Sequence, residues 1–259
     1  QMGWRRPSAR TTQAPASSSM SPTAYAETDP TDAVTVEHFY AYLPSHQYIF
    51  VPSRELWPAV SVNARLGFVQ DADGAQMKAS DYLDRERAVE QMLWTPANDV
   101  IVEDRFIDNG GWVDHPGARC FNQYRPPSLP DGDAELARPW VAHVERVYGE
   151  DSKHVIRWLA QRVQYPAIKI NHALVLGGNQ GVGKDTILEP VKHAIGAWNF
   201  YEVSPQNLLG RFNSFVKSVI LRVSEARDLG DVDRYGFYEH MKTYTATPPD
   251  VLRCDEKNV

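Results

Sequence analysis

The amino-acid sequence predicts an α/β fold, and the order of elements is clearest in the C-terminal part of the chain. Two apolar segments, 172–176 and 219–223, have the length and composition of buried strands. A glycine-rich loop, 177–183, follows the first of them directly. A helical pattern comes next, with apolar residues at Ile187, Leu188, Val191, Ala194 and Ile195. An order of strand, loop, helix and strand is typical of α/β proteins.

The N-terminal segment 1–34 has a different composition from the rest of the chain. It is rich in Ser, Thr, Pro and Ala and has almost no apolar periodicity. Such a segment buries too little surface to offset the entropy lost on ordering, so we predict a disordered linker. A transit peptide is the alternative, since Arg5, Arg6 and Arg10 fit one, although the segment lacks an apolar face.

Residues 35–132 are predicted to form a β-rich accessory region. The segment 48–51 is a strand candidate, and 71–74 and 109–111 carry turn signals. Three tryptophans are expected to pack a small core, although stacking on nucleic-acid bases is the alternative role for such aromatics; they are Trp57, Trp94 and Trp112.

Residues 133–259 are predicted to hold a helical lead-in followed by the α/β core. Apolar residues recur at helical spacing in two stretches, Leu136, Trp140, Val141, Val144 and Val147, and then Val155, Ile156, Leu159 and Val163. Pro166 is expected to end the second helix. This helix also carries basic residues, which form either a solvated face or a local basic surface; they are Lys153, His154, Arg157 and Arg162.

Composition excludes several protein classes. With 259 residues, a net charge of -6 and 42% hydrophobic residues, the chain resembles a globular protein, and no apolar run approaches the roughly 18 residues of a membrane helix. The acidic total gives no support for DNA binding, although a locally basic channel remains compatible with it. The two cysteines, Cys120 and Cys254, exclude a cysteine-based zinc finger and a disulfide framework. A reducing cytoplasm is the expected compartment.

The glycine-rich loop carries the strongest chemical signal. Glycines let backbone N–H groups turn inward as an anion nest, and the N-terminus of the following helix adds unpaired donors and a partial positive charge. The pattern therefore predicts an ATP-binding phosphate loop in which Lys184 reaches the β- and γ-phosphates, with a structural turn as the alternative. The predicted nucleotide-binding residues are Gly178, Asn179, Gln180, Gly181, Val182, Gly183, Lys184, Asp185 and Thr186.

Two residues depart from the usual phosphate-loop pattern. Asp185 occupies the position of the hydroxyl residue that normally ligates Mg²⁺, and Thr186 follows it. Either residue is a candidate metal ligand, Thr186 by a shift of one residue and Asp185 directly or through water. Pro190 is expected to kink or end the helix after about two turns.

The strand predicted at 219–223 ends in Ser224 and Glu225. Phosphate-loop ATPases place an acidic pair at the end of such a strand, beside the loop. We therefore predict that Glu225 activates the attacking water and that Ser224 orients a Mg²⁺-bound water, so that both belong to the metal site. The alternative is that Glu225 is an ordinary surface residue after a buried strand.

The C-terminal end is predicted to be a β-hairpin. The β-forming segment 243–247, the turn 248–250 and the returning strand 251–257 follow one another. Arg253 and Lys257 on this hairpin are candidate contacts to DNA phosphates, the alternative being solvated charges on an ordinary hairpin.

Taken together, these residues resemble the helicase domain of phage and prophage primase-helicases, which is related to the superfamily 3 viral helicases. The resemblance runs from about residue 44 to the end. It is carried by the segments 169–178, 181–186, 211–213, 224–228 and 241–258. In that group the Gly-Lys-Asp-Thr form of the loop is familiar.

The resemblance implies a P-loop ATPase (AAA+-like) core, with ATP and Mg²⁺ as cofactors and Lys184 and Glu225 as catalytic residues. It further implies a homo-hexamer that translocates on single-stranded DNA, a DNA contact by Lys257, an upstream primase domain in the same polypeptide, and the cytoplasm of a bacterial host. We therefore expect a piece of an ATP-driven DNA helicase. Neither a sensor residue nor an arginine finger is recognisable in it. A P-loop switch or helicase loader is the main alternative, and a nucleotide kinase a weaker one.

Overall fold

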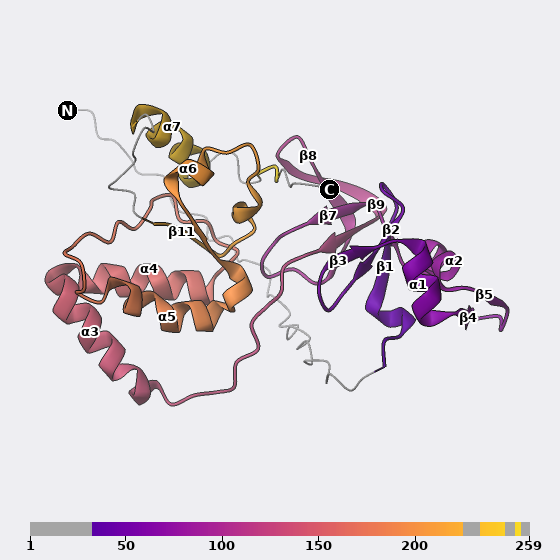
Figure 1. Ribbon diagram of the computed structural model, residues 1–259, viewed down its shortest axis with the longest axis horizontal. Helices are drawn as coiled ribbons and strands as arrows, with labels where there is room; N and C mark the ends of the chain where they lie inside the picture. Colours follow the sequence, from indigo (N-terminus) through magenta and orange to yellow (C-terminus); the bar gives the residue numbers. More distant parts are fainter. Residues whose placement is uncertain (1–32, 225–233, 247–251, 255–259) are drawn as a thin grey trace, which may run out of the picture.

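The computed structural model describes residues 33–224, 234–246 and 252–254, and it has a mixed α/β fold with several small sheets. The predicted linker, 1–34, lies outside the described residues except for its last two positions. In Figure 1, most strands gather on one side of the molecule, and the longer helices α3, α4 and α5 gather on the other. The predicted α/β class is confirmed at this level.

A four-stranded sheet forms the N-terminal half of the molecule, with the order β3-β2-β1-β6. Strand β1 (Phe39–Tyr42) is antiparallel to β2 (Gln47–Phe50) and parallel to β6 (Ala88–Val89), and β3 (Glu55–Trp57) completes the sheet. The strand predicted at 48–51 is β2. Alternate residues of β1 are fully buried because successive side chains point to opposite faces.

Two short helices cover one face of this sheet and were not predicted. Helix α1 (Ala59–Leu66) and helix α2 (Ala79–Glu86) contribute Val62 and Leu83 to its core. Strands β4 (Phe68–Gln70) and β5 (Gln76–Lys78) form a ribbon between the two helices. Each helix has only eight residues, too few for apolar periodicity to stand out in the sequence.

The turn between β4 and β5 is the one predicted at 71–74. The carboxylate of Asp71 accepts backbone hydrogen bonds from Asp73 (3.1 Å) and Ala75 (2.8 Å), the pattern of an Asx-turn. The backbone of Gly74 has a φ of 82°, as the sharp reversal requires.

A three-stranded sheet with the order β7-β9-β8 adjoins the first one. It consists of β7 (Gln91–Leu93), β8 (Ile101–Asp108) and β9 (Gly111–Asn122), and β8 and β9 form a long hairpin. Asn109 and Gly110, with φ of 50° and 81°, make the predicted turn at its tip.

The three tryptophans do not share one core, and this part of the prediction was wrong. Trp57 packs in the first sheet's core, whereas Trp94 packs edge-on against Tyr124 beside the helices. Trp112 stays 38% exposed, with the guanidinium of Arg105 4.3 Å from its ring centre. Periodicity identifies large apolar side chains, but sheet pairing decides which cluster each one joins.

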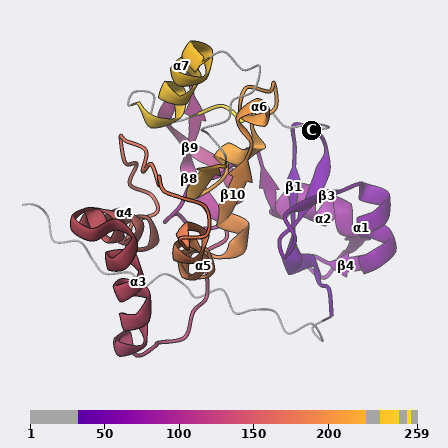
Figure 2. The same cartoon turned by 60° about the vertical axis from the view of Figure 1, so that its left-hand side comes forward.

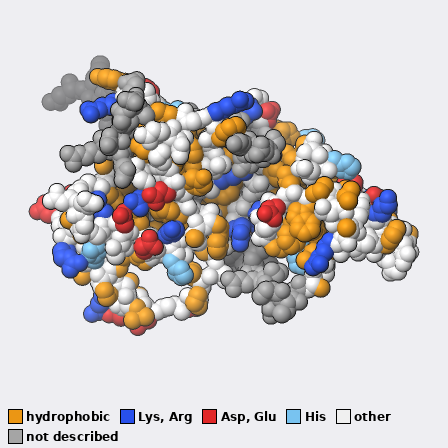
Figure 3. Space-filling view, viewed as in Figure 1, with side chains coloured by type: hydrophobic (Ala, Val, Ile, Leu, Met, Phe, Trp, Pro, Cys, Tyr) orange, Lys and Arg blue, Asp and Glu red, His pale blue; other side chains and the backbone are white. Residues whose placement is uncertain are grey.

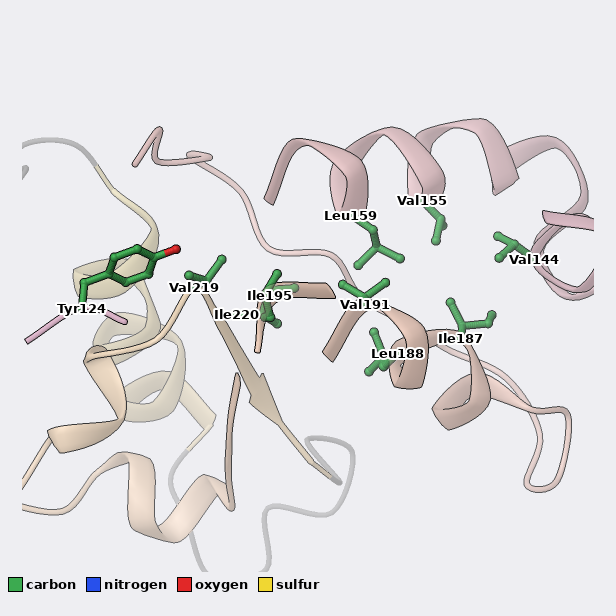
Figure 4. Close-up of a cluster of buried hydrophobic side chains, with 10 residues drawn as sticks. All are labelled: Tyr124, Val144, Val155, Leu159, Ile187, Leu188, Val191, Ile195, Val219 and Ile220. Carbon is green, nitrogen blue, oxygen red and sulfur yellow. The ribbon is translucent and has the colours of Figure 1, made fainter. Parts of the chain in front are cut away.

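The helical lead-in forms as predicted. The 3-10 turn η2 (Ala134–Ala137) leads into helix α3 (Arg138–Tyr148), and the turn η3 (Gly149–Asp151) joins it to α4 (Ser152–Gln164). The side chains of Val144, Val155 and Leu159 on these helices pack against helix α5 (Lys184–Ile195), as Figure 4 shows. Leu136 lies outside this core, with 79% of its surface exposed.

Pro190 does not end helix α5, contrary to that part of our expectation, since the helix continues to Ile195. Proline removes the hydrogen bond to the carbonyl four residues earlier, here that of Thr186. Both Thr186 and Pro190 are exposed, so water can satisfy that carbonyl. The buried face, with Leu188 and Val191, keeps the helix in place.

Arg162 does not belong to the surface of α4. It is buried and donates hydrogen bonds to the carbonyls of Val219 (3.0 Å), Ile168 (2.5 Å) and Pro166 (2.9 Å). Burial lowers the pKa of its guanidinium. The other basic residues of the predicted surface, Lys153, His154 and Arg157, are exposed. Arg162 therefore joins the helical half to the strand that follows Val219.

The second predicted strand, 219–223, is present as β11 (Ile220–Val223), which pairs in parallel with β10 (Phe200–Val203). Between them lie α6 (Pro205–Leu208) and the turn η5 (Ser214–Val216), and the turn η4 (Ala197–Asn199) precedes β10. The first predicted strand, 172–176, is not a strand in the described part of the chain. Leu174 and Leu176 still pack on the core while Val175 is 85% exposed. The side chains therefore alternate between core and solvent as in a strand, although the segment pairs with no described strand.

The predicted C-terminal hairpin is wrong at its first strand. Residues up to Thr245 belong instead to helix α7 (Arg234–Thr245). Phe237, Met241 and Tyr244 recur at helical spacing and pack on the cluster formed by Val203, Leu208 and Phe215. Residues 247–251 and 255–257 of the predicted hairpin lie outside the described residues, and 252–254 has no regular structure.

The two halves meet where the chain leaves β9. The carbonyl of Arg125 accepts hydrogen bonds from the Trp198 indole and the Asn199 amide, both at 2.8 Å. Tyr124 packs in the helical core beside them. Figure 2, turned by 60°, shows β8 and β9 behind β10. Among the described residues, no helix has the length and apolar character required to span a membrane.

Candidate nucleotide-binding site

The glycine loop leads directly into the N-terminus of α5, as predicted. Gly183 is the residue before the helix, and its φ of 87° is one that residues with a Cβ rarely adopt. Gly178 has a φ of 140° at the start of the loop. The ammonium group of Lys184 donates to the carbonyls of Gly178 (3.0 Å) and Asn179 (2.7 Å). The loop therefore curls around the amino group of its own lysine.

Helix α3 holds the other side of this loop, a contact that the sequence did not predict. The indole N–H of Trp140 donates to the carbonyl of Ile187 (3.0 Å). The imidazole Nε2 of His143 lies 3.0 Å from the carbonyl of Gly183, and its Nδ1 lies 2.6 Å from Arg146 Nη2. Trp140 and His143 lie one helical turn apart, and so do the two carbonyls. The sequence does place two residues with ring N–H groups, Trp140 and His143, three positions apart on the same helix face. This spacing is equally typical of ordinary core packing, so it did not indicate the contact.

Asp185, a candidate metal ligand, is paired with a cation. Its carboxylate lies 2.5 Å from the guanidinium of Arg222 on β11, which also lies 3.5 Å from Glu202 on β10. Thr186, the other candidate in the loop, is exposed. Among the described residues, no group of three or more His, Cys, Asp or Glu side chains is arranged to hold a metal ion.

Ser224 lies at the end of β11, beside a carboxylate that the sequence analysis missed. Its hydroxyl donates to Glu202 at 2.5 Å. The parallel register of the two strands, which pairs Glu202 with Arg222, brings these groups together. Glu225, the predicted base, lies outside the described residues. The sequence did not indicate Glu202 because its approach to Ser224 depends on the pairing of β10 with β11, which local sequence does not encode.

A cleft of about 2460 Å³ connects these groups. Its walls include loop residues Gly178, Gln180, Lys184 and Asp185 together with Arg222 and Ser224 of the strand. Side chains of α4, α7 and the β-rich half line the same cleft, among them Trp158, Met241, Trp94 and Gln123. The structure thus brings predicted residues from two distant segments to one concave surface.

The predicted DNA contacts are only partly described. Arg253 is exposed, lines the same cleft and accepts a hydrogen bond from the Asn213 amide at its carbonyl (3.0 Å). Lys257 lies outside the described residues. On the face shown in Figure 3, basic and acidic side chains are interspersed over the helical half. The described part of that face therefore has mixed charge.

Comparison with known proteins gives little further information. No protein-family model matches the chain, and no curated protein does. The chain is similar to a solved structure described as the A form apo structure of the NrS-1 C-terminal region, with 16% identity and a TM-score of 0.44. The similarity covers 68% of this chain and 40% of that one. A similarity with this TM-score assigns neither a family nor an activity.

Proposed function

We propose that this chain binds ATP with Mg²⁺ at the loop 177–186 and belongs to a DNA-translocating motor. The observation that carries the proposal is the loop itself. Glycines with positive φ lead into the N-terminus of a 12-residue helix, and Lys184 is folded back over the loop. Such a loop offers backbone donors, a helix terminus and one ammonium group to an anion. A triphosphate is the ligand that uses all three.

In the proposed site, the residues have separate roles. Backbone N–H groups from Gly178 to Lys184 bind the phosphates, and the Lys184 ammonium bonds the β- and γ-phosphates. Asp185 or Thr186 would hold Mg²⁺, Ser224 would orient a Mg²⁺-bound water, and Glu225 would activate the attacking water. Because Asp185 is paired with Arg222, metal binding at its carboxylate has to break or share that ion pair.

The DNA part of the proposal rests on the resemblance to phage and prophage primase-helicases. The motor would be a homo-hexamer with a primase domain upstream, and Arg253 and Lys257 would contact single-stranded DNA. The large cleft supports the nucleotide part, because Lys184, Ser224 and Arg253 line one surface.

A second function, an ATP-binding switch or helicase loader without unwinding activity, is favoured by one observation. The Ser224 hydroxyl and the Asp185 carboxylate are bonded to Glu202 and Arg222 in this structure. A site that retained these bonds with nucleotide bound would bind ATP but hydrolyse it poorly.

The deciding experiment measures ATP binding, and then ATP hydrolysis with and without single-stranded DNA. Lys184→Ala is expected to abolish ATP binding, while Lys153→Ala, at an exposed position on α4, serves as the matched control. Glu225→Gln is expected to bind ATP but lose DNA-stimulated turnover. Unchanged ATP affinity in Lys184→Ala would refute the phosphate loop. Tight ATP binding with no turnover under any condition would favour the switch.

A further inference from the structure

The contact between helix α3 and the phosphate loop has a defined donor order. Arg146 can only donate hydrogen bonds, so its Nη2, 2.6 Å away, makes the Nδ1 of His143 an acceptor. The ring proton of the neutral imidazole then lies on Nε2, which donates to the Gly183 carbonyl at 3.0 Å. The chain of bonds runs from an exposed arginine to the loop.

The Gly183 carbonyl shares a peptide unit with the backbone N–H of Lys184. That unit is planar and trans, so the C=O and the N–H point in opposite directions. A carbonyl that is held against α3 therefore directs the Lys184 N–H away from α3 and toward the glycine loop. Because Lys184 is the first residue of α5, the helix itself offers this N–H no acceptor. One hydrogen bond made on the far side thus orients a donor on the phosphate side.

The approach is close enough to demand glycine. A Cβ on Gly183 would lie 2.6 Å from two atoms of the His143 ring. Trp140, one turn earlier on α3, makes the parallel bond to the Ile187 carbonyl. Two side-chain donors on one helix thus hold two carbonyls, one turn apart, at the start of the other.

We propose that His143 is a positioning residue for the phosphate loop and that α3 acts through it to hold the Lys184 N–H ready for a phosphate oxygen. The inference rests on the proposed ATP site and adds a residue outside the loop to it. His143 touches neither nucleotide nor metal in this proposal. It sets the orientation of one peptide unit, with Arg146 selecting the tautomer that donates.

The test compares His143→Gln with His143→Asn. The glutamine amide N–H reaches the position of Nε2, whereas the shorter asparagine amide ends near the position of Nδ1. Both variants are polar and similar in size, so a difference between them reports the bond to Gly183. His193→Asn, at an exposed position in the last turn of α5, controls for asparagine in a helix.

The measurement is the affinity for ATP with Mg²⁺ by isothermal titration calorimetry, after circular dichroism has shown that each variant is folded. Wild type must bind first, because absence of binding there refutes the proposed function and not the role of His143. We expect His143→Asn to bind ATP about 3- to 10-fold more weakly and His143→Gln to bind close to wild type, as for the loss of one hydrogen bond. Equal affinity in both variants, whether weakened or unchanged, would overturn the proposal.

Discussion

The guanidinium of Arg222 lies 2.5 Å from the carboxylate of Asp185, so that the second residue of helix α5 is joined to strand β11. The two residues are separated by 37 positions in the chain. The Asp185 side chain is 75% exposed and that of Arg222 is 29% exposed. A pair at this level of exposure adds little to stability, so we expect its main effect at the proposed metal site.

Asp185→Asn separates these two roles. We expect the free energy of unfolding to fall by less than about 1 kcal/mol, because exposed ion pairs are screened by water. If Asp185 also ligates Mg²⁺, ATP binding in the variant becomes much less dependent on Mg²⁺ concentration. Calorimetric titrations of ATP at several Mg²⁺ concentrations measure this. A Mg²⁺ dependence equal to that of wild type would remove Asp185 from the metal site.

Arg162→Met is expected to be strongly destabilising. The guanidinium is buried and donates to three backbone carbonyls, which the variant leaves without these donors. We expect a loss of about 3 kcal/mol in the free energy of unfolding, measured by urea denaturation. Arg157→Met, at an exposed position on the same helix, should change it by less than about 0.5 kcal/mol. Similar values for the two variants would contradict the role given to Arg162.

Gly183→Ala tests the close approach of α3 to the loop. Gly181 has a similar φ, 79° against 87°, but a Cβ there would meet no atom within 4 Å. Gly181→Ala should therefore cost only the backbone strain, about 1–2 kcal/mol. Gly183→Ala adds the clash with His143, about 1–3 kcal/mol more.

The clash can be isolated by a double-mutant cycle. The variant Gly183→Ala with His143→Ala should lose less stability than the sum of the two single variants, because the second change removes the obstructing ring. Additive losses in urea denaturation would show that the His143 ring is not what makes Gly183 necessary.

The two cysteines should react at different rates. Cys120 is buried, and burial raises the pKa of its thiol to about 11, whereas Cys254 is half-buried. The thiolate is the reactive form, so at pH 8 we expect iodoacetamide to modify Cys254 first and Cys120 only after unfolding. Peptide mass spectrometry at successive times measures both. Rapid modification of Cys120 in the folded protein would contradict its buried position on β9, the central strand of the sheet β7-β9-β8.

The sequence by itself determined the elements whose signals are local. Glycines at positive φ, a lysine at the first helical position and apolar spacing along α3, α4 and α5 all act within a few residues. The turns at 71–74 and 109–111 were readable for the same reason, since their geometry depends on the Asp, Asn and Gly residues that form them.

Only the tertiary structure decided the rest. Thr243–Thr245 form the end of a helix and not a strand, because Met241 and Tyr244 pack on a cluster formed by residues far upstream. The tertiary structure also buried Arg162, and it brought Glu202 to Ser224 and His143 to Gly183. The bond from Arg162 to Val219 spans 57 positions, the contact of Glu202 with Ser224 spans 22, and that of His143 with Gly183 spans 40. Local propensity carries no information on such pairs, which form only when strands align and helices pack.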